Sequence, residues 1–151
     1  MQSDNTIKIR RRHLPHWTAK DAVYFITFKI WEGDFDNEER SIILQHIIDG
    51  NNNYYQLFAA IVMPDHVHLI LSPLEEYDLE RIMKGIKEVS AYKVNNKRGA
   101  RGQIWQDECF DRIIRDEKEY DEKIKYMFEN PVRKGIIQDN EVYEFWFVNV
   151  L

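Results

Sequence analysis

The apolar positions along the chain follow two different spacings. Apolar residues three and four positions apart indicate amphipathic helices, and this spacing is found over residues 37–49, 78–95 and 116–130. Short runs rich in β-branched and aromatic residues are typical of strands, and such runs lie at residues 22–31, 54–63, 66–71 and 108–115. The pattern therefore predicts four strands and three helices.

Residues with strong local preferences set the expected boundaries. Asn37 and Asp116 are predicted to cap the N-termini of the first and third helices, because a short polar side chain can accept from the free amides there. The third helix is expected to end at Asn130, since Pro131 disfavours helical geometry in the residue before it. A tight turn at 64–65 is expected to join the second and third strands as a hairpin.

The predicted order is strand, helix, strand, strand, helix, strand, helix. Two split βαβ halves of this kind favour a ferredoxin-like (βαββαβ) α+β sandwich with an antiparallel sheet, followed by a C-terminal helix. Residues 1–20 are predicted to be a basic N-terminal arm, and residues 21–151 a single domain. Residues 95–103 are predicted to be a loop, and no element is predicted for the tail that ends in EFWFVNVL.

The charge of the chain is unevenly distributed. The 151 residues carry a net charge of −5, which as an average does not suggest a nucleic-acid partner. However, residues 1–20 carry +4 and residues 80–103 carry +5, which leaves −14 on the remainder. The single cysteine, Cys109, excludes an internal disulfide, and no apolar run approaches ~18 residues. We therefore expect a cytoplasmic protein with two basic patches on an acidic body.

A pair of histidines lies on the third predicted strand. His66 and His68 share one face, because side chains two positions apart on a strand point the same way. Two neighbouring imidazoles on one face provide two ligands for a divalent metal. Asp65 at the turn is suited either to orienting a ring or to capping the hairpin. The alternative is that two surface histidines alternate by chance.

One face of the third predicted helix combines a phenol with a carboxamide. Tyr126 lies off the apolar stripe, and Asn130 is one turn further along on its face. A phenol near a metal can act as a covalent nucleophile, and an amide oxygen is a suitable ligand for Mg²⁺ or Mn²⁺. The alternative is that Tyr126 packs at a helix edge while Asn130 caps the C-terminus before Pro131.

Four blocks of sequence together resemble a known family. The runs are RRHLPHW, YFITF, MPDHVHLIL and IWQDECFDRIIRDEKEYDEKIKYMFENPVRKGI, and they extend from about Arg10 to Gly135. In this order they resemble the HUH-class single-tyrosine transposases, and more narrowly the REP-associated tyrosine transposases of bacteria. His66-Val67-His68 matches the His-apolar-His motif of that class. Residues 126–133 match its Tyr-Ile-x-x-Asn-Pro-Val-Arg run, with Met127 in place of isoleucine.

This resemblance implies a mechanism and a substrate. It implies that His66, His68 and Asn130 hold a divalent metal, Mg²⁺ or Mn²⁺, and that Tyr126 is the nucleophile of a catalytic set completed by the two histidines. The expected substrate is single-stranded DNA that contains a hairpin. Cleavage would give a 5′-phosphotyrosine link and a free 3′-hydroxyl, and another strand's 3′-hydroxyl would reverse the reaction. Members act as monomers or as homodimers, and both states stay open.

The basic patches are candidates for contact with nucleic acid. Phosphate contacts fix the position of the protein on DNA, and the candidates for them are Arg10, Arg11, Arg12, Lys84, Lys87, Arg98 and Arg101. Trp17 and Trp105 are candidates for stacking on unpaired bases, although Trp105 also suits the core. Two other functions stay open. One is a non-catalytic single-stranded nucleic-acid-binding module, and the other is a metal phosphodiesterase that uses water in place of Tyr126.

Overall fold

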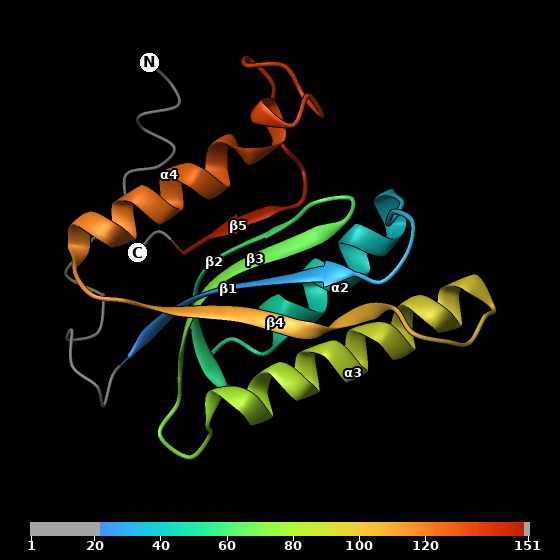
Figure 1. Cartoon of the computed structure of the whole chain (residues 1–151), viewed down its shortest axis with the longest axis horizontal. Coiled ribbons are helices and arrows are strands. Elements are labelled where there is room, and N and C mark those ends of the chain that lie inside the picture. The colour runs from blue at the N-terminus through green and yellow to red at the C-terminus, as the bar shows by residue number, and fades with distance from the viewer. Residues whose placement is uncertain (1–21, 150–151) are drawn as a thin grey trace.

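The computed structural model describes residues 22–149, which form one sheet covered by helices on both faces (Figure 1). The arm at residues 1–20 lies outside the described residues. The elements in chain order are β1 (Val23–Ile30), α2 (Asn37–Asp49), β2 (Tyr55–Val62), β3 (His66–Pro73), α3 (Leu79–Arg98), β4 (Trp105–Ile114), α4 (Glu117–Arg133) and β5 (Trp146–Val148).

The sheet has five strands in the order β4-β1-β3-β2-β5, and every neighbouring pair is antiparallel. The first four strands with α2 and α3 make the expected βαββαβ unit, so the predicted α+β fold class is confirmed. The predicted hairpin between β2 and β3 is also confirmed. It closes with Val62 opposite Val67 and with a hydrogen bond of 2.8 Å from the Met63 amide to the His66 carbonyl.

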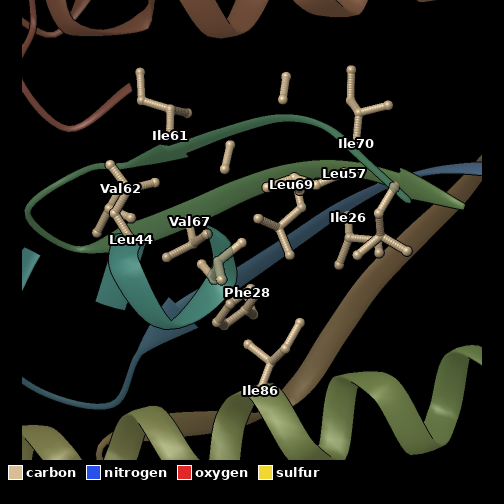
Figure 2. Packing of buried hydrophobic residues seen from close by; sticks show 14 of the residues in the cluster. Ile26, Phe28, Leu44, Leu57, Ile61, Val62, Val67, Leu69, Ile70 and Ile86 are labelled. Atoms are coloured by element: carbon tan, nitrogen blue, oxygen red, sulfur yellow. The ribbon is translucent and has the colours of Figure 1, made fainter. Parts of the chain in front are cut away.

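The helices divide between the two faces of the sheet. Figure 1 shows α2 and α3 on one face and α4 alone on the other. Figure 2 shows Phe28, Leu69 and Ile86 packed between the sheet and α2 and α3, while Ile61 and Ile70 point toward the α4 side. All five side chains are buried. The alternation of strand residues therefore sends one set of side chains into the main core and the other set toward α4.

The start of α2 differs from the prediction by one residue. The N-cap is Asp36 rather than Asn37, and its side chain accepts from the Glu39 amide at 2.8 Å. The Glu39 side chain accepts in turn from the Asp36 amide at 3.0 Å, which completes a capping box. Asp36 rather than Asn37 is the N-cap because the residue three positions after Asp36 is Glu39, which can complete the box.

The segment between α3 and β4 is shorter than predicted. α3 continues to Arg98 and ends where Gly99 adopts a left-handed conformation, φ 65°. Arg98 is therefore a helical residue rather than part of a loop. β4 begins earlier than predicted, at Trp105, whose side chain is 5% exposed and whose indole donates to Ser90 at 2.9 Å. The core interpretation of Trp105 is thus confirmed.

The end of the chain holds two further differences. α4 does not end at Asn130 but continues through Pro131 to Arg133. Pro131 removes one helical hydrogen bond and crowds the preceding turn, but Asn130 and Pro131 are both buried, so packing in the core keeps this turn helical. The tail forms β5, whose Phe147 pairs with Ala60 at the edge of the sheet. Among residues 22–149, no helix has the length and apolar character needed to cross a membrane.

Candidate active site

The two histidines of β3 lie side by side on the face of the sheet that α4 covers. Their ring centroids are 4.7 Å apart at 74°. In the register of β1 and β3, Lys29 is opposite His66 and Thr27 is opposite His68. His68 is buried, whereas His66 is half-buried. The predicted shared face of the two imidazoles is therefore present in the structure.

Helix α4 brings Tyr126 to this histidine pair. The phenol ring of Tyr126 meets the His68 ring edge to face, with centroids 5.5 Å apart. Phe25 stacks on His68 with ring centroids 5.3 Å apart and contacts Tyr126 at 6.4 Å, so the three rings form one cluster. Tyr126 is 43% exposed and lines a surface cleft. A residue 60 positions further along the chain thus reaches the strand that carries the histidines.

Both imidazoles are oriented through their Nδ1 atoms. Nδ1 of His66 is 2.6 Å from a carboxylate oxygen of Asp65, and Nδ1 of His68 is 2.8 Å from the Thr27 hydroxyl. When Nδ1–H donates to the Asp65 carboxylate, the lone pair of His66 is on Nε2. The same assignment is available to His68 if Nδ1–H donates to Thr27. Asp65 therefore orients a ring, which is one of the two roles predicted for it.

The surroundings of His68 favour its neutral form. Burial is the largest cause that lowers the pKa of His68 to about 3, and electrostatic interactions with His66, Arg133, Lys123 and Lys134 contribute to the same shift. A neutral imidazole keeps a lone pair, which is the form that binds a metal.

Two of the candidate metal ligands carry buried polar atoms that have no hydrogen-bond partner among the described residues. Among residues 22–149, Nε2 of His68 and both polar atoms of the Asn130 amide are buried without a hydrogen-bond partner. Buried polar groups are rarely left unsatisfied without a reason. The described residues contain no group of three His, Cys, Asp or Glu that could hold a metal, so a third ligand has to be of another type. An amide oxygen such as that of Asn130 is of a suitable type, and the assignment of Asn130 as the third ligand beside His66 and His68 stays a prediction.

The alternative interpretation, in which Asn130 caps the C-terminus of the helix, is wrong. It is fully buried three residues before the end of α4, and the C-cap is Lys134. Tyr126 likewise does not simply pack at a helix edge, because it faces His68.

The site opens into a cleft of about 630 Å³ between the sheet and α4. Besides the histidines, Tyr126, Thr27 and Asp65, its lining includes Phe25, Lys29, Phe110, Lys123 and Lys134. Sequence reasoning missed these five residues and also Thr27. Lys123 could have been found from its position one turn before Tyr126 on the same helix.

The basic residues predicted to contact nucleic acid are not gathered in this cleft. Lys87 donates to the Gln106 carbonyl at 2.7 Å, and Arg98 donates to Glu39 at 2.8 and 3.0 Å. Lys84 lines a groove between α3 and β4, and Arg101 is exposed after α3. Arg10, Arg11, Arg12 and Trp17 lie outside the described residues. A role of any of these residues in binding DNA stays a prediction.

Comparison with known proteins gives a consistent set of similarities. A family model described as "Transposase IS200 like" matches residues 27–129, a range that includes both histidines and Tyr126. The "Putative REP-associated tyrosine transposase" of Haemophilus influenzae is 27% identical over 144 residues, which cover 85% of this chain and 78% of the relative. A REP-associated tyrosine transposase of Escherichia coli is 26% identical over 92 residues, which cover 60% of this chain and 53% of that protein.

A solved structure shares the fold. The structure of a REP-associated tyrosine transposase bound to a REP hairpin matches with a TM-score of 0.67 at 22% identity. The match covers 82% of this chain and 74% of the other. The arrangement of one sheet between two helices and a third helix is therefore common to both proteins.

Proposed function

The chain belongs to the IS200-like transposase family, and from that membership we propose that it cuts and rejoins single-stranded hairpin DNA through Tyr126. Membership confirms the family resemblance seen in the sequence. The observation that carries the proposal is the contact between Tyr126 and His68, with ring centroids 5.5 Å apart on an open cleft. The hairpin substrate is supported by the similar structure, which is that of a transposase bound to a REP hairpin.

The chemistry begins with attack by the Tyr126 oxygen on a phosphodiester. The new bond joins this oxygen to phosphorus, and the bond from phosphorus to the 3′-oxygen breaks. The proton lost by the phenol is matched by the proton gained on the leaving 3′-oxygen. The link stores the energy of the broken bond, so the 3′-hydroxyl of another strand can attack the phosphotyrosine and restore the phenol. No nucleotide cofactor is required.

His66, His68 and Asn130 are the residues that would hold a divalent metal, Mg²⁺ or Mn²⁺. When bound, such an ion supplies Lewis-acid polarisation of a phosphate oxygen. The protein's part is to keep the imidazoles neutral and oriented, which Asp65 and Thr27 support through the Nδ1 contacts. The partly exposed phenol of Tyr126 then meets the phosphate from the α4 side.

The test is a search for the covalent intermediate. The chain is incubated with Mn²⁺ and a pool of single-stranded oligonucleotides that share a hairpin stem and have randomised flanks. A label at the 3′ end stays with the protein, because the phosphotyrosine forms on the 5′ end of the downstream fragment. We expect a labelled protein–DNA band on a denaturing gel that is absent from Tyr126→Phe and from samples without metal.

The other outcomes separate the competing functions. Binding of the pool without any cleavage would contradict the proposal in favour of a non-catalytic binding module. Cleavage that survives in Tyr126→Phe would instead indicate a phosphodiesterase that uses water. Tyr24→Phe is a suitable control, because Tyr24 is on β1 but lines the groove on the opposite face of the sheet.

A further inference from the structure

The cleft around Tyr126 contains three lysines that the proposed chemistry does not use. They are Lys29 on β1, Lys123 on α4 and Lys134 at the end of α4, and we call them the cleft lysines. Among residues 22–149, none of them forms an ion pair with a carboxylate. The single carboxylate in the cleft lining, Asp65, is engaged by His66. The cleft therefore concentrates positive charge, which the carboxylate of Glu119, one turn before Lys123, offsets only in part.

The cleft lysines surround the nucleophile. Lys123 precedes Tyr126 by three residues, and its ammonium lies 4.9 Å from the centroid of the Phe25 ring, which holds it over the cleft. Lys134 follows Tyr126 by eight residues, so the two lysines are separated by about 16 Å along the helix direction. Lys29 approaches from the sheet, opposite His66.

We propose that the cleft lysines bind the phosphodiester backbone of a single DNA strand on both sides of the bond that Tyr126 attacks. This inference rests on the proposed function, and it assigns backbone contacts to residues other than the basic patches of the sequence. Unpaired cations in a cleft are a site for phosphates. Phe110, which is 55% exposed at the cleft, offers an aromatic face on which an unpaired base can stack.

The distribution of charge favours this cleft over the rest of the surface. The whole chain carries −5, so a DNA strand is repelled by much of the molecule. Lys87 and Arg98, two of the bases of the second basic patch, donate to groups within the protein. The cleft lysines have no such partner among the described residues. A strand therefore gains the most charge neutralisation where its backbone passes Tyr126.

The test measures how salt weakens DNA binding. The probe is a fluorescein-labelled oligothymidylate, which forms no hairpin, and its dissociation constant is measured by anisotropy over a range of salt concentrations. For a single strand, each phosphate that the protein neutralises adds about 0.7 to the slope of log K against log salt. We expect Lys123→Met and Lys134→Met each to reduce the slope by about this amount, and the double variant to reduce it by about twice as much.

The matched control is Lys125→Met, because Lys125 is an exposed lysine on the same helix that does not line the cleft. Methionine preserves the apolar stem that packs against Phe25, so folding is maintained. Slopes equal to that of Lys125→Met in both cleft variants would overturn the inference. In parallel, the unchanged chain is tested in the assay for the covalent protein–DNA band. A covalent band together with unchanged slopes rejects only this inference, whereas reduced slopes without a band reject only the proposed function.

Discussion

Asn130 combines complete burial with an amide that has no hydrogen-bond partner among residues 22–149. An unsatisfied buried amide costs about 1–3 kcal/mol. Such a cost is explained if the oxygen is reserved for a metal, and it is unexplained if the residue serves the fold alone. The stability of the protein and its metal affinity should therefore respond in opposite directions to a change at this position.

We predict that Asn130→Leu makes the metal-free protein more stable, by about 1–3 kcal/mol, because it removes the unsatisfied amide and leaves a side chain of similar size. The same variant should bind Mn²⁺ about tenfold more weakly or worse, as expected when the protein has one ligand fewer. Urea unfolding in the absence of metal measures the first quantity, and titration calorimetry with Mn²⁺ measures the second.

Met127→Leu is the control, since Met127 is equally buried on α4 and the exchange conserves volume. It should leave Mn²⁺ affinity unchanged and shift stability by less than about 1.5 kcal/mol. If Asn130→Leu binds Mn²⁺ like the unchanged chain and loses stability, then the amide has a structural role instead.

At the scale of elements, α2 and α3 are joined by a charged cluster around Glu39. This buried carboxylate accepts from Arg98 at 2.8 and 3.0 Å and from Lys97 at 3.2 Å. The hydrogen bonds from Arg98 are the main cause that lowers the pKa of Glu39 from 4.5 to about 2. Lys97 also donates to Asp36, the N-cap of α2. The end of α3 is therefore fastened to the start of α2.

This cluster predicts a pH dependence of stability. Because the folded-state pKa is lowered, the ionised Glu39 contributes stability above pH 4.5, and that contribution is lost as the pH falls toward 2. Its size at pH 7 is on the order of 3 kcal/mol. We expect the difference in unfolding free energy between the unchanged chain and Glu39→Gln to be largest near neutral pH and to vanish in strong acid. A difference that does not change with pH would contradict this account.

The elements also show which features can be predicted from sequence. The strands β1 to β3 are recovered because their apolar runs are long and bounded by turn residues. The end of α4 was predicted too early, since the rule for the residue before proline is local and the packing of Asn130 and Pro131 in the core is not. β5 was missed because a run of three strand residues carries too weak a pattern, and its pairing with Ala60 is a long-range contact.

The same distinction applies to the site. His66, His68, Tyr126 and Asn130 were singled out because their spacing on one strand and one helix is readable. The cleft lysines and Thr27 were not singled out from the sequence. They belong to the site only through the register of β1 with β3 and the placement of α4. Such contacts join segments far apart in the chain, and no local pattern records them.

At the scale of the whole molecule, the two faces of the sheet are supported differently. α2 and α3 pack against each other as well as against the sheet, whereas α4 lies alone on the other face (Figure 1). Part of the support of α4 comes from the chain's last strand, since Phe128 meets Trp146 with ring centroids 5.8 Å apart. Near its other end, Tyr120 contacts Phe58 at 6.1 Å. Among residues 22–149, the helix that carries the nucleophile is thus the one that packs on the sheet without a second helix beside it.

We predict that α4 opens more readily than α3 in native-state hydrogen exchange, because α3 packs against α2 whereas no second helix among residues 22–149 packs against α4. Trp146→Ala should raise the exchange rates of α4 amides by about tenfold, which corresponds to about 1.4 kcal/mol, and should leave those of α3 unchanged. The phosphotyrosine band should weaken in parallel, since Tyr126 then spends less time beside His68. Trp31→Ala is the matched control, because Trp31 is 55% exposed and precedes α2 on a connecting segment. Equal acceleration of α3 and α4 in Trp146→Ala would show that the two faces unfold as one unit and would contradict the prediction.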